Sequence, residues 1–317
     1  MHMPEIILSA TNLCKRYDGT NVVNQVSFSI NKGEFFGLLG PNGAGKTTTI
    51  GILTGLVPPT KGTVSIEGMD MAEKPLTVKS KIGFVPQDFA FYPTLNARDN
   101  LLFFGRIYGL QGKNLKQQID KTLRMVGLSE RAGDRVSTFS NGMKRRLNIA
   151  IGMLHDPNIL ILDEPTVGVD THMRQAILGN LRRLNQNSLT ILYTTHQMLK
   201  AQHLCHRVAI MDKGRIMAIQ TPSALIANLG QGVVRICFEQ AILPSQIEAL
   251  AQVGPLTHKD PYVVHIKLSS SNADQIVKHI WHIAEQTQTP IASLSILKPS
   301  LETVFLDLTG RKIDPGG

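Results

Sequence analysis

The chain has 317 residues, with few cysteines, few aromatic residues and no long apolar run. Its three cysteines, Cys14, Cys205 and Cys237, lack the spacing of a metal site, so we expect buried or half-buried thiols. Aromatic residues make up 5%, which argues against an aromatic platform for nucleic acid. No window reaches the ~18 uncharged apolar residues of a membrane-spanning helix. The first residues do not resemble a signal peptide, so we expect a reducing, cytoplasmic setting.

The overall composition of the chain is typical of a packed globular protein with an excess of positive charge. Hydrophobic residues make up 42% and charged residues 18%. The net charge is +9, and the excess lies in the first 230 residues because the rest is nearly balanced. Such a surface suits nucleotide phosphates, an anionic membrane face or nucleic acid, and charge alone does not choose among them.

Residues 1–230 predict an α/β domain, because short apolar runs alternate with helical stretches. Four apolar runs predict buried strands of a parallel sheet, at residues 34–40, 82–86, 158–163 and 189–195. The stretch of about 90–155 has no clear strand after residue 95 and shows helical periodicity instead. We expect it to form a helical subdomain inserted into the parallel-sheet core.

Residues 231–317 predict a small accessory α+β domain. The two glycines of Leu229–Gly232 are typical of a linker before it. Apolar and amphipathic segments then predict strands at 233–238, 262–268 and 290–297, and helices at 244–252, 273–286 and 299–308.

The segment from Gly40 to Thr47 fits the phosphate-binding pattern Gly-x4-Gly-Lys-Ser/Thr at every constrained position. It follows an apolar strand and opens a helix predicted to run to Leu53. Its glycines let backbone N–H groups converge on an anion, where the helix N-terminus adds positive potential. We therefore expect Lys46 to neutralise the β- and γ-phosphates of a nucleotide, and the Thr47 hydroxyl to bind Mg²⁺.

Two adjacent carboxylates, Asp163 and Glu164, follow a second apolar strand. A buried strand that ends in Asp163 places this carboxylate beside the phosphate-binding loop, where it holds the shell of Mg²⁺. We expect Glu164 to point elsewhere and to polarise a water for in-line attack on the γ-phosphate. A nucleoside triphosphate and Mg²⁺ are therefore the predicted ligands.

The segment from Thr138 to Leu147 resembles the signature motif of ATP-binding cassette (ABC) ATPases, a P-loop NTPase family in which this motif is usually Leu-Ser-Gly-Gly-Gln. Other elements of the family occur in its order and spacing: the adenine-stacking aromatic Tyr17, the Q-loop residue Gln87, the D-loop residue Asp170 and the switch histidine His196. The resemblance covers residues 5 to about 225.

The resemblance implies that two cassettes pair head to tail with ATP between them. The helix that follows Ser140 would then face the γ-phosphate of the partner's nucleotide. The implied catalytic residues are Glu164, His196 and Gln87. The implied nucleotide contacts are Tyr17, Gly40, Pro41, Asn42, Gly43, Ala44, Gly45, Lys46, Thr47, Thr48, Ser140, Asn141, Gly142 and Asp170. The implied ligands of Mg²⁺ are Thr47, Gln87 and Asp163.

The signature departs from the family pattern at two positions. Asn141 replaces the first glycine, and Met143 replaces the glutamine. Asn tolerates left-handed backbone better than most residues, so we expect the loop to form. The basic run from Lys144 to Arg146 is expected to form the solvated face of a helix, with a role in an interface as the alternative.

The signature, the segment after Asp163 and the tail from Pro299 to Arg311 together resemble an exporter branch of the family that includes daunorubicin-resistance-type ATPases. Substrates in that branch range over drugs, lipids and polysaccharides. The resemblance implies integral membrane permease subunits and a second copy of the chain as partners, and a peripheral place on the cytoplasmic face of the inner membrane. No nucleic acid is expected as a partner.

Other classes of protein share parts of this pattern. A DNA-repair or chromosome-structure ATPase uses the same cassette, and the basic charge mildly favours it. However, no long heptad segment or zinc-type cysteine set interrupts this cassette. A translation factor of the family would normally carry two cassettes, and a P-loop kinase has no use for a signature at Ser140.

Overall fold

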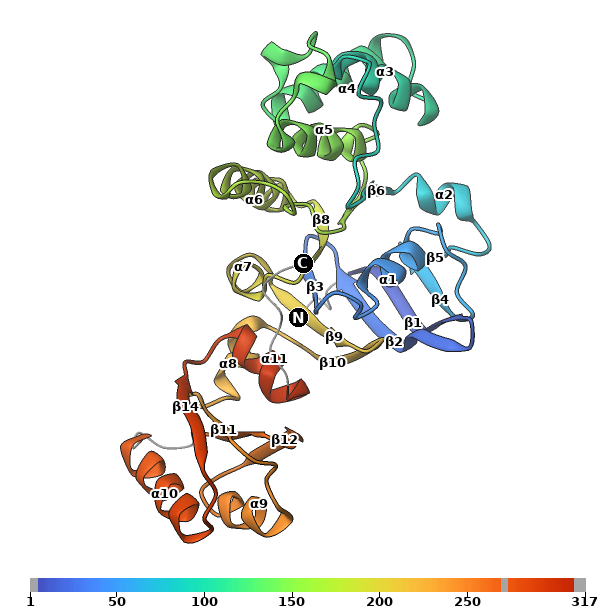
Figure 1. Ribbon diagram of the computed structural model, residues 1–317. Coiled ribbons are helices and arrows are strands. Elements are labelled where there is room, and N and C mark those ends of the chain that lie inside the picture. Colours follow the sequence, from blue (N-terminus) through green and yellow to red (C-terminus); the bar gives the residue numbers. More distant parts are fainter. Residues whose placement is uncertain (1–4, 269–272, 311–317) are drawn as a thin grey trace. The chain divides into compact units, whose positions relative to one another are not determined.

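The computed structural model describes residues 5–268 and 273–310. The chain divides into two compact units (Figure 1). The first contains the chain as far as His196 together with Leu204–Ile216, and the second contains Gln197–His203 and the chain from Met217 onward. Every residue predicted to contact the nucleotide or Mg²⁺ lies in the first unit.

A parallel sheet forms the centre of the first unit, in the strand order β9-β3-β8-β7-β6. Its strands are β3 (Phe35–Leu39), β6 (Ile82–Val85), β7 (Ile159–Leu162), β8 (Thr190–Thr195) and β9 (Arg207–Asp212). Every residue of β3, β7 and β8 is buried, as expected for parallel strands covered on both faces. The four predicted strands are confirmed to within one residue at each end, whereas β9 was not predicted. After β9 the chain turns into β10 (Arg215–Gln220) and passes into the second unit.

The first unit also contains an antiparallel sheet that was not predicted, in the order β2-β1-β4-β5. Its strands are β1 (Ile6–Tyr17), β2 (Thr20–Asn31), β4 (Lys61–Ile66) and β5 (Met69–Asp70). Asp18 and Gly19 join β1 to β2 with φ of 44° and 83°, the positive values of a two-residue type I′ turn. This Asp-Gly pair was therefore a readable sign of the hairpin.

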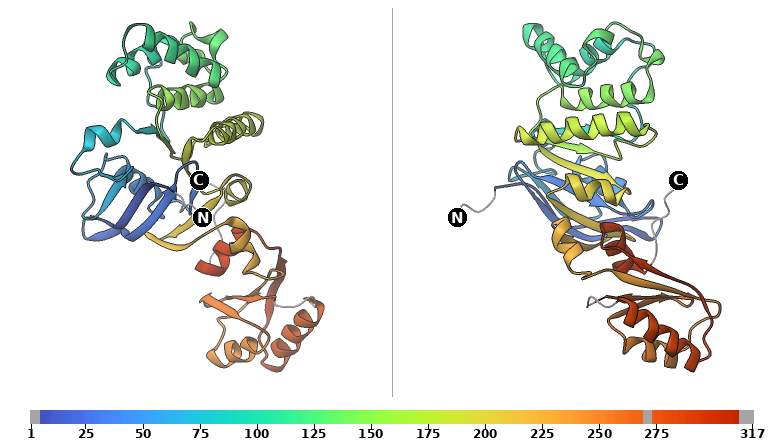
Figure 2. Two further views of the ribbon diagram at one scale, coloured as in Figure 1. Left: turned by 180° about the vertical axis from the view of Figure 1, so that it is seen from behind. Right: turned by 90° about the vertical axis from the view of Figure 1, so that its left-hand side faces the viewer.

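Helices without strands occupy the segment after β6, as predicted. They are α3 (Ala97–Ile107), α4 (Gly112–Met125), the 3-10 turns Ser129–Arg131 and Val136–Thr138, and α5 (Asn141–Met153). The helices α3, α4 and α5 pack together (Figure 2). The short helix α2 (Pro75–Lys79) precedes β6. Within residues 5–268 and 273–310, no helix has both the length and the apolar character needed to cross a bilayer.

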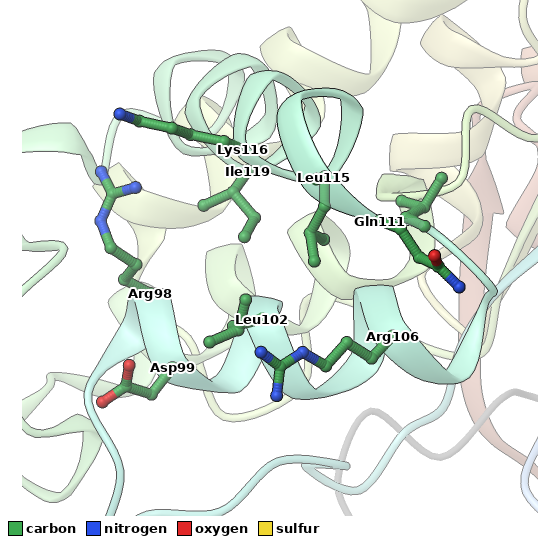
Figure 3. A pocket seen from close by; sticks show the side chains of 10 residues that line it. Arg98, Asp99, Leu102, Arg106, Gln111, Leu115, Lys116 and Ile119 are labelled. Carbon is green, nitrogen blue, oxygen red and sulfur yellow. The ribbon is translucent and has the colours of Figure 1, made fainter.

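A cavity of about 610 Å³ lies between α3 and α4 (Figure 3). Leu102 of α3 and Leu115 and Ile119 of α4 point into it. The charged residues of its lining are Arg98, Asp99, Arg106 and Lys116. The cavity therefore combines an apolar floor with a mainly cationic rim.

The C-terminal part of the second unit has the element order β-α-β-β-α-β. The elements are β11 (Val233–Phe238), α9 (Pro244–Ala251), β12 (Leu256–Asp260), β13 (Val263–Lys267), α10 (Ala273–Gln286) and β14 (Ile291–Leu297). The strands form an antiparallel sheet in the order β12-β13-β11-β14, which is the ferredoxin-like arrangement. The predicted elements are confirmed, and β12 was missed. We propose that this domain begins after Gly230.

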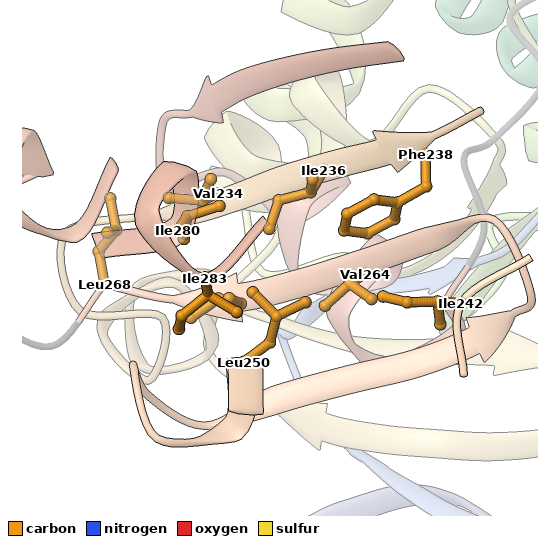
Figure 4. Close-up of a cluster of buried hydrophobic side chains, with 10 residues drawn as sticks. Val234, Ile236, Phe238, Ile242, Leu250, Val264, Leu268, Ile280 and Ile283 are labelled. Atoms are coloured by element: carbon orange, nitrogen blue, oxygen red, sulfur yellow. The ribbon is translucent and has the colours of Figure 1, made fainter. Parts of the chain in front are cut away.

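One buried cluster forms the core of this domain (Figure 4). Ile236 of β11 lies between the half-buried Arg235 and Cys237. Val234 and Ile236 belong to the same cluster as Leu250 of α9 and Ile280 and Ile283 of α10. The second unit also contains α8 (Pro222–Ala227), α11 (Leu301–Thr309) and all of α7 (Met198–Leu204) except Leu204. Helices α8 and α11 pack against each other.

Candidate active site

The phosphate-binding loop lies between β3 and helix α1 (Lys46–Leu53). A Cβ on Gly40 would lie 2.3 Å from the carbonyl oxygen of Met211, and one on Gly45 would lie 2.6 Å from that of Val22. Side chains at these positions are therefore excluded by neighbouring backbone. Gly43 and Gly45 have φ of 77° and 100°, which glycine adopts without strain. The backbone N–H groups of the loop consequently lie at the N-terminus of α1, where the helix dipole favours the binding of an anion.

Lys46 is the first residue of α1 and is only 5% exposed. Its ammonium group donates hydrogen bonds to the carbonyl oxygens of Gly40, at 2.9 Å, and Pro41, at 3.0 Å. The same nitrogen lies 3.2 Å from Oε1 of Glu164. The loop therefore holds this buried cation beside a buried carboxylate.

Glu164 joins Lys46 to the predicted switch histidine. Its other carboxylate oxygen, Oε2, lies 2.7 Å from Nδ1 of His196. The sequence predicted a place for Glu164 away from Asp163, but it gave no sign of the contact with Lys46. The backbone of Glu164 has φ of 45°, in the left-handed region that non-glycine residues rarely adopt.

The hydroxyl of Thr194 connects the two adjacent acids. It donates to Oδ1 of Asp163 at 2.7 Å and accepts from the backbone N–H of Glu164 at 2.9 Å. Thr194 is fully buried. It therefore fixes the Asp163 carboxylate and stabilises the left-handed turn that directs Glu164 toward Lys46 and His196.

The order of the parallel sheet explains why these residues meet. The strands β3, β8, β7 and β6 are neighbours, and their carboxyl ends lead into the phosphate-binding loop, His196, the acidic pair and Gln87 respectively. Ligands of open α/β sheets bind outside the carboxyl ends of the strands. Topology thus assembles four separate motifs at one edge.

The signature and D-loop positions lie at the N-termini of α5 and of α6 (Thr171–Gln186). Ser140 caps α5 by accepting from the N–H of Met143 at 3.3 Å, and Asp170 caps α6 by accepting from that of Met173 at 2.9 Å. A Cβ on Gly142 would lie 2.9 Å from the Met173 side chain, so glycine permits this close packing. Ser140 and Asp170 are both exposed.

Asn141 does not need the tolerance of left-handed backbone that the sequence suggested. Asn141 is the first residue of α5 and has helical rather than left-handed backbone. Its side-chain amide lies 3.5 Å from the carbonyl oxygen of Gly168, which is within reach of a weak hydrogen bond to the D-loop.

The expected solvated face at Lys144–Arg146 is wrong for its central residue. Arg145 is only 3% exposed and contacts Pro86 and Phe89, which lie on either side of Gln87 in the sequence. Three basic residues in a row predicted a solvated face, and only the packing of α5 shows that Arg145 is buried and that Arg146 is half-buried. Gln87 itself is exposed after β6. Tyr17 is 44% exposed at the end of β1, with the Lys15 ammonium 5.1 Å from its ring centre.

The residues present fit a magnesium nucleotide. Thr47 is exposed in the first turn of α1, and Asp163 supplies a buried carboxylate. Within the part of the chain that the structure describes, no group of three or more His, Cys, Asp or Glu side chains could hold a metal. Mg²⁺ typically binds through one or two protein oxygens together with substrate phosphates, and Thr47 and Asp163 offer such oxygens.

A model of the ABC transporter family matches residues 23–167. The chain is 40% identical to the linearmycin resistance ATP-binding protein of Bacillus subtilis over 312 residues, which cover 97% of this chain and 99% of the relative. It is 36% identical to the Nod factor export ATP-binding protein I of Paraburkholderia xenovorans, covering 98% and 99%. A dimeric ATP-binding cassette bound to ADP and Pi matches with a TM-score of 0.62 and 27% identity, over 68% of this chain and 98% of that one. The chain therefore belongs to the ABC transporter family, in which it is an ATP-binding subunit with the ATPase cassette.

Proposed function

We propose that this chain hydrolyses ATP to drive export through separate integral membrane subunits, with Glu164 as the general base. The observation that carries the catalytic part is the Glu164 carboxylate, which lies between Lys46 and His196 at the edge of the parallel sheet. The direction of transport is supported by the relatives, one named for linearmycin resistance and one for Nod factor export.

Each contact of the site has a role in this proposal. Lys46 exchanges its ion pair with Glu164 for the β- and γ-phosphates, which frees one carboxylate oxygen to accept the proton of the attacking water. His196 holds the other oxygen and so orients the base. Thr47, Gln87 and Asp163 would hold Mg²⁺, which neutralises developing charge on the phosphates.

We propose that the second half of each ATP site comes from another copy of the chain. Ser140 and Asp170 cap exposed helix N-termini, which favour negative charge. A phosphate of the partner's nucleotide would bind at the start of α5, beside Ser140, Asn141 and Gly142. The similar cassette bound to ADP and Pi is itself a dimer.

The membrane subunits would bind the helical subdomain, on the cytoplasmic face of the inner membrane. Phe89, Tyr92 and Phe103 are 39%, 47% and 40% exposed, and the rings of Tyr92 and Phe103 lie 5.0 Å apart. Exposed apolar groups gathered near Gln87 are typical of an interaction surface. The cavity between α3 and α4 offers a second surface nearby, with a cationic rim.

Glu164→Gln tests the assignment of the base. We expect turnover to fall by about 10²–10⁴-fold because the amide cannot accept the proton, while ATP binding persists and an ATP-bound dimer accumulates. Steady-state hydrolysis, equilibrium nucleotide binding and size-exclusion with light scattering measure these three quantities. Lys46→Ala is the matched control, since it should weaken ATP binding itself. Hydrolysis by Glu164→Gln at near the parent rate would show that the base is misassigned.

A further inference from the structure

Two buried side chains of α5 hold the loop that carries Gln87. Arg145 and Asn148 are 3% and 1% exposed. They are three residues apart on one helix, so they face the same direction. Both contact residues 86–90, the segment that follows β6.

The Asn148 carboxamide bonds to this loop on both sides. Its nitrogen donates to the carbonyl oxygens of Pro86 at 3.2 Å and Asp88 at 3.4 Å. Its oxygen accepts from the backbone N–H of Ala90 at 3.2 Å. One side chain thereby forms hydrogen bonds with three backbone groups of the loop. A side chain of another length or polarity would leave those backbone groups without these hydrogen bonds.

Arg145 adds a contact of a different kind. Its Nη1 donates to the carbonyl oxygen of Pro86 at 3.1 Å, and its guanidinium lies 4.8 Å from the ring centre of Phe89. A cation at this distance over an aromatic face is attracted to it. Burial lowers the pKa of Arg145, and the charge of Asp88 acts in the opposite direction. Backbone, aromatic and charged groups of the loop are thus all engaged.

The neighbouring residue Arg146 provides a contrast. Its Nη1 donates to the carbonyl oxygens of Val126 and Gly127, each at 3.1 Å, at the end of α4. It therefore anchors the same helix, carries the same chemical group and contacts a different segment.

We propose that Arg145 and Asn148 are positioning residues that make the Gln87 loop and α5 move as one body, and so couple the two ATP sites of a dimer. The inference rests on the proposed function, in which Gln87 serves the nucleotide of its own chain and Ser140, at the start of α5, serves that of the partner. Because the two elements are joined, a nucleotide that draws Gln87 toward one site also places Ser140 at the other. Occupation of one site then favours occupation of the second.

The test is the ATP dependence of hydrolysis by the purified full chain. We expect the parent to show a Hill coefficient above 1, with 2 as the limit for two sites. Arg145→Met and Asn148→Leu keep the approximate size of each side chain and remove its bonds to the loop. We expect each to lower the Hill coefficient to about 1, with a rise in the KM for ATP. Arg146→Met is the matched control and should keep the parent coefficient.

Several outcomes would overturn the proposal. These are a parent coefficient of 1, variants that retain the parent coefficient, or an equal loss in Arg146→Met. If a variant does not fold, Arg145→Lys and Asn148→Ala replace it, with the lysine expected to retain part of the cooperativity through its charge and single donor. Failure of the proposed function would give a different result from failure of this inference. In the first case, Glu164→Gln would hydrolyse ATP like the parent, whatever the Hill coefficient of the parent.

Discussion

At the scale of single residues, Thr194 determines the directions in which the side chains of Asp163 and Glu164 point. Asp163 and Glu164 are adjacent in sequence, yet one contacts Thr194 and the other contacts Lys46 and His196. The left-handed backbone of Glu164 itself separates the directions of the two side chains, and such a backbone costs roughly 1–2 kcal/mol for a residue other than glycine. The hydrogen bond from the N–H of Glu164 to Thr194 offsets part of that cost.

Thr194→Val keeps the shape of the side chain and removes the hydroxyl. The buried N–H of Glu164 and the Asp163 carboxylate would each lose a partner, so we expect the free energy of unfolding to fall by about 1–3 kcal/mol. Turnover should fall by about tenfold or more, because Glu164 is no longer held toward His196. Urea unfolding and steady-state kinetics measure the two effects. Thr194→Ser restores the hydroxyl and should recover both, and an unchanged turnover in the valine variant would contradict the role.

At the scale of elements, His155 attaches the end of α5 to the central sheet. It lies just after α5, its ring stacks on that of Tyr108 with centres 4.0 Å apart, and its Nε2 lies 3.0 Å from the carbonyl oxygen of Ile82 in β6. Burial lowers the pKa of His155 below its ordinary value of about 6.5. Neutral His155 donates from Nε2, and among the residues that the structure describes no acceptor bonds to its buried Nδ1, the atom that an added proton would occupy.

This contact predicts a pH-dependent stability of the first unit. The unfolded chain binds a proton at His155 more readily than the folded chain, so stability rises with pH between the folded and unfolded pKa values. The contribution of His155 should be complete above about pH 7 and should be lost as the pH falls through 6.5 toward the lower folded value. Urea unfolding at several pH values measures it, with His155→Phe as the comparison. An identical pH profile in the two proteins would refute the prediction.

At the scale of the whole molecule, the C-terminal domain is joined to α7 (Met198–Leu204) and α8 as well as by the chain itself. The backbone N–H of Leu301 in α11 donates to Oε1 of Gln202 in α7 at 3.3 Å, and α11 packs on α8. Leu301 and Phe305 are fully buried. The second unit therefore depends on α11 for part of its apolar core.

Deletion of residues 232–317 should affect stability without affecting nucleotide binding. It removes α11 and exposes apolar surface of α7 and α8, so we expect the Tm to fall by several degrees. The affinity for ATP should change less than about twofold, because every predicted nucleotide contact lies in the first unit. Calorimetry and equilibrium binding test this. Phe305→Ala in the full chain should reproduce part of the fall in Tm, and a large loss of ATP affinity in the deletion variant would show that the C-terminal domain supports the site.

The sequence by itself determined the motifs and most of the elements that carry them, because these depend on spacing along the chain. Local patterns of residues were enough to predict three of them without the fold. These are the glycine-rich loop Gly40–Thr47, the buried strand before Asp163 and the helix that Ser140 caps. The tertiary structure alone decided which side chains meet. The pairs Lys46–Glu164, Thr194–Asp163 and Arg145–Pro86 join residues brought together by the order of the parallel sheet and the packing of α5. Neither strand order nor the direction in which a basic residue turns is encoded by local periodicity, so these contacts had to be seen in three dimensions.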